Sequence, residues 1–368
     1  MKNKIKSIGL MSGTSSDGLS IAYTEIDFDK KKIFIPFFKT YPYDKRLRKE
    51  IMMARELPLS DIAGLNYKLG MLWSDMIEKF ITENKIKLNG IDVISSHGQT
   101  VYHSSKERVT LQIGEPEFIS RRFNLPVAYD FRCGDIIAGG EGAPLIPFMD
   151  EFLFGERKKP VGLLNIGGIS NISVVGKGVK TYGFDIGPGN TLMDWSVVIK
   201  TNGRRDYDKN GELASRGRID FKRINKFMKN KFFKKRPPKS LDREEFGKDF
   251  VIKNFDFKKE RIEDILATLN YFTAVVISDA IKRFVKENMD ELVISGGGVY
   301  NRTLVKNISE LISPVRVSSI SDYGIEPLAK EAAGFALLGA AKILNIPSNC
   351  PCVTGAKKRV VLGKLVNG

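Results

Sequence analysis

The feature that most constrains the fold is a pattern that occurs once in each half of the chain: an apolar strand, a glycine-rich turn and a second strand. In the first half KIKSIGLM is followed by the turn SGTSSDG and by LSIAYTEID. In the second half VGLLNIGGISNISVVG and TYGFDIGPGN show the same arrangement. Apolar residues at three- and four-residue steps then predict a helix over about 60–84 and another over about 260–287. The pattern predicts an α/β protein with two domains.

The length of the chain also favours two domains, since 368 residues can form two separate cores. We expect an N-terminal domain over residues 1–130, completed by the C-terminal segment 345–368, and a second domain over 131–344. No linker rich in proline or serine separates them. Because α/β proteins commonly bind ligands between such parts, we expect a cleft between the two domains.

The chain is strongly basic, with 59 Lys and Arg against 43 Asp and Glu and a net charge of +16. A positive field attracts polyanions, which makes nucleic-acid binding one hypothesis. Much of the excess lies in residues 221–240, where Ile224, Phe227, Phe232 and Phe233 alternate with lysines as in an amphipathic helix. No pattern typical of a nucleic-acid-binding fold accompanies it. We therefore interpret the lysines as a solvated face and predict no nucleic-acid partner.

Cysteine and histidine usage excludes several other classes. Cys133, Cys350 and Cys352 do not form a disulfide framework, and the two histidines are too few for a histidine-rich metal site. The basic start of the chain is interrupted too early for a secretory signal, and no apolar run is long enough to cross a bilayer. These observations predict a cytoplasmic protein without a membrane partner.

Three glycine loops carry the functional signal. Each alone is as typical of a structural turn as of a ligand site, and none matches a P-loop or a dinucleotide fingerprint. Their order is more specific: SGTSSDG, then an acid directly after a strand at Phe184–Asp185, then the strand–glycine–helix turn SGGGVYN. This order is typical of ATPases that hold phosphates between two hairpins and adenosine against a glycine-rich helix entry. Backbone N–H groups from Gly13 to Gly18 would form the anion-binding nest, and Asp17 would hold Mg²⁺ through water.

With these residues in view, the chain resembles the anhydro-N-acetylmuramic acid kinase family, within the actin, sugar-kinase and heat-shock ATPase superfamily. The matching stretches follow in family order from residue 9 to residue 363: GLMSGTSSDG, SSHGQTVYH, LQIGEP, DFRCGDIIAGGEGAPLIP, NIGGISNIS, GFDIGPGNTLMD, PPKSLDREEFG, SGGGVYNRTL and VTGAKKRVVLG. The resemblance implies a two-domain ribonuclease H-like (actin-like ATPase) architecture, the use of ATP and Mg²⁺, and a homodimer.

The reaction that the resemblance implies combines hydrolysis and phosphorylation. Water opens the 1,6-anhydro bridge of 1,6-anhydro-N-acetylmuramic acid while O6 takes the γ-phosphoryl group of ATP, giving N-acetylmuramic acid 6-phosphate in the recycling of cell-wall sugar. Asp185 matches the family's catalytic aspartate and is expected to be the general base for the water. The substrate-side residues are expected to be His97, Gln99, Thr100, Arg132 and Glu331, with His97 positioning its loop and Arg132 suited to a planar anionic group.

Nucleotide contacts are expected along all of the glycine loops. The predicted set consists of Gly13, Thr14, Ser15, Ser16, Asp17, Gly18, Leu19 and Ser20 in the first loop, Gly167, Gly168, Gly187, Gly189 and Asn190 in the second half, and Gly296, Gly297, Gly298 and Asn301 beside the adenosine.

Alternatives remain open at this point. Ser16, Ser20 and Glu141 depart from the family pattern, and Glu141 adds a negative charge where glutamine is usual. A kinase for another 1,6-anhydro sugar of the levoglucosan type is therefore one alternative. An ATP-binding regulator of the same fold without catalysis is another, although Asp17 and Asp185 are both present.

Overall fold

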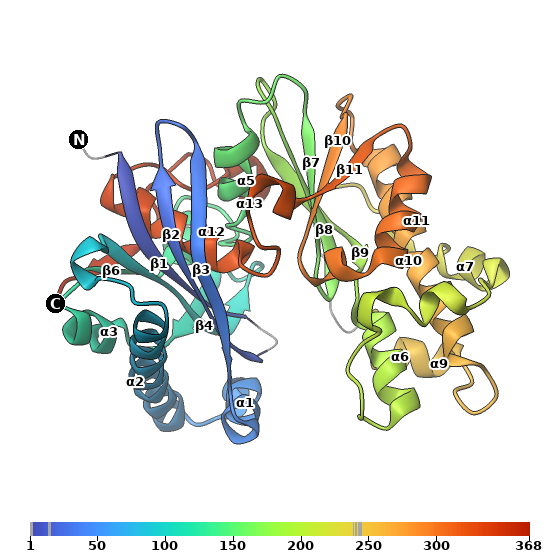
Figure 1. Ribbon diagram of the computed structural model, residues 1–368, viewed down its shortest axis with the longest axis horizontal. Coiled ribbons are helices and arrows are strands. Elements are labelled where there is room, and N and C mark those ends of the chain that lie inside the picture. The colour runs from blue at the N-terminus through green and yellow to red at the C-terminus, as the bar shows by residue number, and fades with distance from the viewer. Residues whose placement is uncertain (1–2, 14–15, 238, 240, 242–244) are drawn as a thin grey trace. The chain divides into compact units, whose positions relative to one another are not determined.

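The computed structural model describes residues 3–13, 16–237, 239, 241 and 245–368 (Figure 1). The chain forms two compact units: the first unit is Met1–Leu153 with Gly324–Gly368, and the second unit is Phe154–Tyr323. These limits differ from the expected boundaries at 130/131 and 344/345. The difference arises because more of the chain packs on the first sheet: Gly134, for example, lies close against Leu362.

The first unit contains one mixed sheet. Its strands run in the order β12-β6-β4-β1-β2-β3, and β5 pairs with β4. The pairs β1–β2 and β2–β3 are antiparallel, whereas β1–β4 and β4–β6 are parallel. The strands are β1 (Lys4–Ser12), β2 (Gly18–Asp27), β3 (Lys32–Pro42), β4 (Val93–Ser104), β5 (Val109–Ile113), β6 (Val127–Tyr129) and β12 (Lys364–Val366).

The sheet of the second unit has the same plan. Its order is β11-β10-β7-β8-β9, with an antiparallel meander from β7 to β9 and parallel pairs β7–β10 and β10–β11. The strands are β7 (Val161–Ile166), β8 (Ile169–Val175), β9 (Tyr182–Pro188), β10 (Glu291–Ser295) and β11 (Arg316–Ser319). In each unit a meander of three strands is thus extended by parallel strands beside its first strand. The duplicated topology confirms the expected α/β, ribonuclease H-like architecture of the two units.

Helices cover the sheets of both units (Figure 1). The first unit has α1 (Lys45–Met52), α2 (Leu59–Glu83), α3 (Pro116–Phe123), α4 (Phe131–Ile137), α5 (Pro147–Phe154), α12 (Lys330–Ile343) and α13 (Pro351–Thr354); the second has α6 (Thr191–Thr201), α7 (Phe221–Phe227), α8 (Lys231–Lys234), α9 (Lys248–Asn254), α10 (Ile262–Phe284) and α11 (Arg302–Ile312). The predicted helices over 60–84 and 260–287 are confirmed as α2 and α10.

Each unit has a hydrophobic core of its own. In the first unit Leu65, Leu69 and Trp73 of α2 pack with strand residues such as Ile8. In the second unit α10 is buried along most of its length and packs with Phe227 and other apolar side chains. Among the described residues, α10 is also the one helix that is long and apolar enough to span a membrane, but 78% of its most apolar window is buried, as in a core helix.

The lysine-rich segment is amphipathic as predicted, but it is not one helix. Two short helices, α7 and α8, replace it, because Asn230 adopts an extended conformation between them and its side chain accepts a hydrogen bond from Phe232 N. Phe227, Phe232 and Phe233 are buried, as the periodicity requires. The amphipathic spacing is thus divided between two short helices within the described residues.

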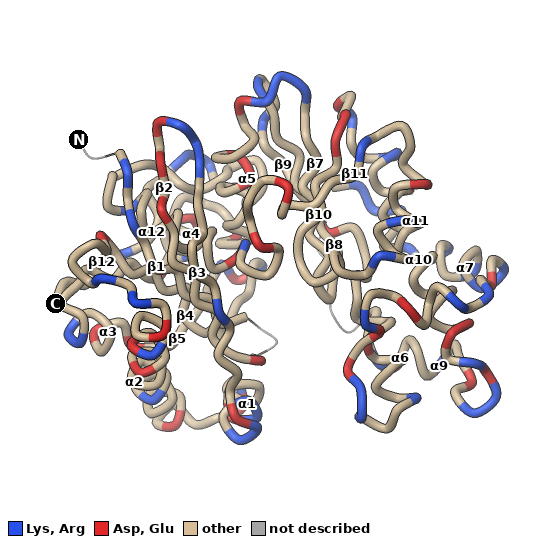
Figure 2. The backbone as a smooth tube through the Cα atoms, in the orientation of Figure 1, with Lys and Arg blue, Asp and Glu red and all other residues tan. Residues whose placement is uncertain are grey.

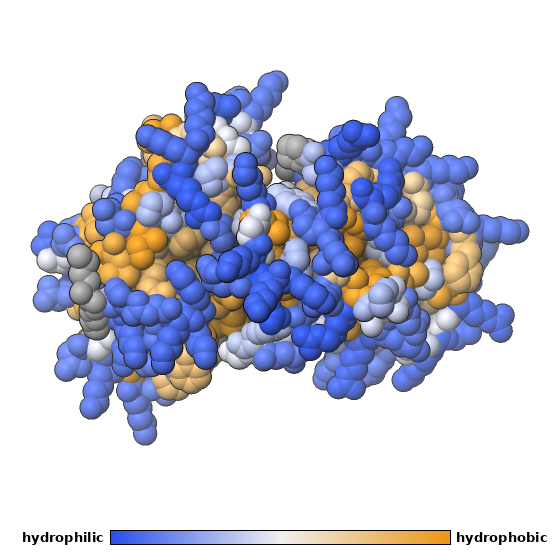
Figure 3. Space-filling model, turned by 90° about the horizontal axis from the view of Figure 1, so that it is seen from above, coloured by the Kyte–Doolittle hydropathy of each residue, from blue (hydrophilic) through white to orange (hydrophobic). Residues whose placement is uncertain are grey.

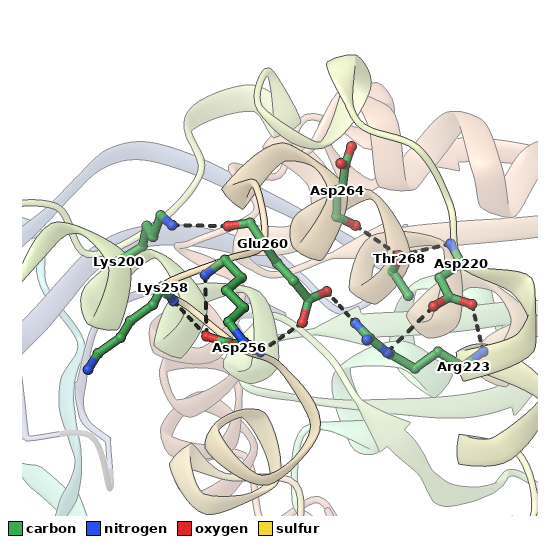
Figure 4. A network of polar contacts seen from close by, with 9 residues as sticks. Lys200, Asp220, Arg223, Asp256, Lys258, Glu260, Asp264 and Thr268 are labelled. Carbon is green, nitrogen blue, oxygen red and sulfur yellow. Dashed lines mark hydrogen bonds and ion pairs between the residues drawn. The ribbon is translucent and has the colours of Figure 1, made fainter.

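Charged groups on this side of the second unit are paired with one another (Figure 4). Arg223 of α7 donates to Glu260 over 2.7 Å and lies above the ring of Phe255. Asp220 accepts a hydrogen bond from Arg223 N and caps α7. Lysines and arginines are spread along the whole chain (Figure 2), and hydrophilic side chains project from much of the face shown in Figure 3. The net charge is therefore distributed over many elements, in agreement with the interpretation of a solvated face.

The contact between α12 and the first sheet depends on glycine. A Cβ atom at Gly9 of β1 would lie 1.9 Å from Ala332 O and 2.6 Å from Ala336 N, which are both backbone atoms of α12. On the next strand, Ser95 donates a hydrogen bond to Phe335 O. The backbone of α12 therefore lies directly against the strands β1 and β4. This contact fixes the position of Glu331, which lies in the first turn of the helix.

We predict that Gly9→Ala destabilises the protein by about 2–3 kcal/mol, because neither backbone can move away without separating α12 from the sheet. The matched control is Gly64→Ala, in the exposed middle of α2 with no atom within 4 Å of the new Cβ; it should stabilise the helix by about 0.5–1 kcal/mol. Urea unfolding of both variants measures the difference. Equal stability of the two variants would contradict the close approach.

Candidate nucleotide and sugar site

Three glycine turns of the second unit meet at the end of β7. The turn at Gly167 and Gly168 joins β7 to β8, and its carbonyls accept hydrogen bonds from Asn190 N and Gly189 N, each over 2.8 Å. Glycine is required here, because a Cβ at Gly189 would lie 2.3 Å from Gly167 O. The structure thus brings the predicted second and third segments of the site together.

The turn after β10 lies against the same strand end. Gly296 has a φ of +80°, and a Cβ on it would lie 2.7 Å from Ile166 O. Gly297 faces more open space, since the one atom within 4 Å of its Cβ position is Asn190 Nδ2 at 3.8 Å. A flat ligand can therefore approach the backbone at Gly297. Because β7 and β10 are parallel neighbours, their carboxyl ends necessarily lie at the same edge of the sheet.

Asp185 lies on β9, the edge strand that β8 separates from β7, and it is bonded to residues 239 and 241. Its backbone N–H donates to Lys239 O over 3.1 Å, and its Oδ2 accepts from Leu241 N over 2.9 Å. The carboxylate is partly buried. The bond from Leu241 N orients the carboxylate, which is a group able to act as a general base.

Part of the first loop lies outside the described residues, namely Thr14 and Ser15. Ser16 has a φ of +54° and donates its N–H to Gly13 O over 3.0 Å, so the turn is tight. Asp17 is exposed and forms an ion pair of 2.6 Å with Arg48.

Several predicted contacts have structural roles. Gly18, Leu19 and Ser20 belong to β2, where Leu19 is fully buried and Ser20 Oγ bonds to Thr40. In the second unit, Asn301 caps α11 with its side chain and also accepts from Asn270. Thr100 Oγ1 accepts from Gln112. These side chains are engaged within the fold.

Gln99 is placed beside the first loop rather than apart from it. Its Nε2 donates to Gly13 O over 3.3 Å, and its Oε1 accepts from Ser12 Oγ over 2.5 Å. Ser12 Oγ also bonds to the hydroxyl of Tyr43, which accepts from Trp73 Nε1. Burial raises the pKa of Tyr43 to about 12, which keeps its hydroxyl neutral. This chain of buried bonds fixes the entry to the first loop. The sequence did not single out Trp73, because hydrogen-bond partners leave no periodic signal.

His97, Arg132 and Glu331 form a second cluster in the first unit. Arg132 Nη2 lies 2.9 Å from His97 Nε2, and its Nη1 donates to Gly142 O over 2.9 Å. Because a guanidinium only donates, Nε2 of His97 is the acceptor and its ring is neutral. Burial, and then the Arg132 charge, lower the pKa of His97 to about 3. The ring of Phe335 packs against the His97 ring, with 4.6 Å between the two ring centres.

The Arg132 guanidinium has capacity left for a ligand. Its buried Nε atom has no hydrogen-bond partner among the described residues. Burial lowers the pKa of Arg132 to about 10, and the charge of Glu331 opposes that change. Three of the five predicted sugar-side residues, His97, Arg132 and Glu331, therefore lie close together in the first unit, and they include one cation and one anion.

Asp135 supports this cluster and was not predicted. It is fully buried, and its Oδ2 accepts from the N–H of Gly142, the residue whose carbonyl receives Arg132. Its Oδ1 accepts from Asn349 and Thr354 of the C-terminal segment. The sequence signal is only an acid inside a glycine-rich stretch, which does not distinguish a buried network from an exposed loop.

We predict that His97 contributes a specific pH dependence to stability. Since its pKa in the folded state lies below the ordinary 6.5, the unfolded chain binds a proton that the folded one does not, and stability falls as the pH falls from about 6.5 toward 3. The slope is up to about 1.4 kcal/mol per pH unit. His97→Gln, whose amide oxygen still accepts from Arg132, should lose this part of the slope in urea unfolding between pH 7 and 5.

The matched control is His103→Gln. Burial also lowers the pKa of His103, which is half-buried, so this variant should change the slope less. If the free energy of unfolding falls equally in wild type and His97→Gln between pH 7 and 5, His97 is not held neutral in the folded protein.

Comparison with known proteins identifies the family of the chain. The family model for anhydro-N-acetylmuramic acid kinase matches residues 5–368. A protein of that name from Francisella tularensis subsp. novicida is 38% identical, and the match covers 97% of each chain. Another from Caldanaerobacter subterraneus subsp. tengcongensis is 37% identical, and the match covers 97% of this chain and 96% of the relative. Among solved structures, component A of (R)-2-hydroxyglutaryl-CoA dehydratase from Acidaminococcus fermentans has a TM-score of 0.46 at 13% identity, covering 92% and 99% of the two chains. The chain belongs to the anhydro-N-acetylmuramic acid kinase family.

Proposed function

We propose that Asp185 is the general base of an ATP-dependent kinase that opens 1,6-anhydro-N-acetylmuramic acid with water and phosphorylates O6. Two hydrogen bonds carry this assignment. Asp185 N donates to Lys239 O, which fixes the backbone of Asp185, and Leu241 N donates to its Oδ2, which orients the partly buried carboxylate. A turn-capping aspartate would bond to its own turn, whereas Asp185 is bonded by a segment more than fifty residues away.

The chemistry balances with one base. Asp185 takes a proton from water, and the water oxygen forms a bond to C1 of the sugar. The bond between C1 and the bridging oxygen breaks, and its electron pair stays on that oxygen, which becomes O6. O6 then forms a bond to the γ-phosphorus of ATP as the bond to ADP breaks. The products are the 6-phosphosugar, ADP and a proton.

The sugar is proposed to bind through the cluster of the first unit. Arg132 offers an unpartnered Nε donor to the lactyl carboxylate, which is a planar anion of the kind that a guanidinium binds well. Glu331 offers an acceptor for sugar hydroxyls. The hydrogen bond from Arg132 Nη2 to His97 Nε2 orients the guanidinium, which supports a positioning role for His97.

ATP is proposed to bind along Gly167, Gly168, Gly189 and Gly297, with the first loop contributing Gly13, Ser16 and Gly18. Asp17 fits a magnesium ion that keeps most of its water, because it is one exposed carboxylate next to this loop. Its pairing with Arg48 means that the ion would have to displace a cation. When bound, Mg²⁺ would screen the phosphate charge. A cytoplasmic location remains a prediction from the sequence composition, and a homodimer remains a prediction from the family resemblance.

We predict that Asp185→Asn lowers kcat by at least about 100-fold, because the base is lost. The amide oxygen can still accept from Leu241 N, so folding and ATP binding should be retained. Coupled ADP release with the anhydro sugar measures turnover, and calorimetry measures ATP binding.

The control is Asp290→Asn, an exposed acid paired with Lys159 just before β10, whose removal should leave kcat unchanged. Near wild-type turnover in Asp185→Asn would overturn the assignment of the base. Loss of ATP binding in the same variant would instead assign Asp185 to the nucleotide.

A further inference from the structure

Lys239 is a buried lysine enclosed by aromatic rings. Its side chain belongs to a residue that is 8% exposed, and its Nζ lies 4.6 Å from the ring centre of Phe232, 4.9 Å from that of Phe284 and 5.9 Å from that of Phe184. No hydrogen-bond partner for this ammonium is found within the described part of the chain. Ring faces attract a cation, but they do not replace the hydrogen bonds that burial removes. The fold alone gives no reason to bury a lysine here.

The same residue is bonded to the backbone of Asp185. Lys239 O accepts from Asp185 N, and two residues further on Leu241 N donates to Asp185 Oδ2. Residues 239 and 241 thus run beside β9 at the position of the carboxylate. Phe184, one of the three rings around the ammonium, directly precedes Asp185. Movement of Lys239 would therefore disturb Asp185 through its backbone and through its neighbour.

Charged groups from several elements act on this lysine. Burial, and then Arg283 of α10, hold the pKa of Lys239 down to about 8. Asp279 of α10 and Asp185 of β9 act in the opposite direction, and Lys235, after α8, lowers the pKa slightly. At neutral pH Lys239 is therefore still a cation, and the charge of Asp185 is close enough to influence it.

We propose that Lys239 is a positioning residue for Asp185: its ring-enclosed ammonium keeps the neighbouring carboxylate ionised, and its backbone sets the direction of that carboxylate. This inference rests on the proposed role of Asp185 as the base. The phosphates of a bound nucleotide carry several negative charges, which favour protonation of any carboxylate close by. The positive charge of Lys239, on which Asp185 acts electrostatically, offsets that effect, so that the base remains able to accept a proton while ATP is bound.

The test compares the pH dependence of kcat in Lys239→Met, Lys239→Arg and Lys235→Met. Methionine fills the space between the rings without charge, and arginine keeps the charge. Lys235 is an exposed lysine that lies over the same Phe232 ring, at 5.9 Å, and is the matched control. We expect the acid limb of the kcat profile to move up by about one pH unit in Lys239→Met. It should stay in place in Lys239→Arg and Lys235→Met.

A purely structural role gives a different result. Lys239→Met would then lower kcat by the same factor at every pH without moving the acid limb, and that outcome would overturn the proposal. An equal shift of the acid limb in Lys235→Met would also overturn the proposal, because the shift would then reflect the net charge of the surface rather than Lys239.

A second measurement does not depend on catalysis or on the folding of a Lys239 variant. NMR titration of the Lys239 side chain, in wild type and in Asp185→Asn, should give a lower pKa in the variant, because the nearby negative charge is lost. The two groups act on each other, so the Lys239 titration should move in Asp185→Asn if the acid limb of kcat moves in Lys239→Met.

The two measurements separate the two claims. An unchanged Lys239 titration in Asp185→Asn contradicts the electrostatic contact itself. A lowered titration together with full turnover of Asp185→Asn leaves the contact in place and removes the proposed base.

Discussion

The parallel pairing of β7 with β10 is the constraint on which the second unit's site depends. Because the two strands run in the same direction, the turn at Gly167–Gly168 and the turn at Gly296–Gly297 come to the same edge of the sheet. The antiparallel strands β8 and β9 then return the chain to that edge at Gly187–Gly189. Glycines are needed where these turns touch, since side chains there would collide with backbone atoms. One sheet topology thus converts three separate glycine segments into one surface.

Buried polar networks hold this scaffold and its counterpart in the first unit. Trp73, Tyr43 and Ser12 support Gln99 beside Gly13, and Asp135 supports Gly142, which in turn holds Arg132. In the second unit the backbone at 239 and 241 holds Asp185. In each case a group expected to meet a ligand is oriented by buried groups that do not meet it. Such support limits the rearrangement needed when the ligand binds.

The sequence predicted most of the fold, because periodicity and glycine turns are local signals. The strands around Gly9 and Asp185 and the helices α2 and α10 follow from apolar spacing alone. His97, Arg132 and Glu331 were named as sugar-side residues through the family resemblance, but their contacts with one another had no signal in the sequence. The break at Asn230 was missed, since one extended residue within a regular lysine and phenylalanine pattern leaves no periodic trace. Asp135 and Lys239 were missed for a related reason: a buried charge is recognised by its partners, and partners distant in sequence have no spacing signal. The domain limits differed because α4, α5 and α12 are added to the first sheet by packing rather than by chain order.

In the proposed reaction water attacks C1, while the sugar's own bridging oxygen receives the phosphoryl group. A single turnover in ¹⁸O-labelled water, followed by mass spectrometry of the 6-phosphosugar, tests this directly. Unlabelled turnover product, incubated in labelled water for the same time, corrects for exchange at C1. We expect one ¹⁸O at C1 and none in the phosphate. Absence of label at C1 above the exchange control, or label in the phosphate, would contradict it.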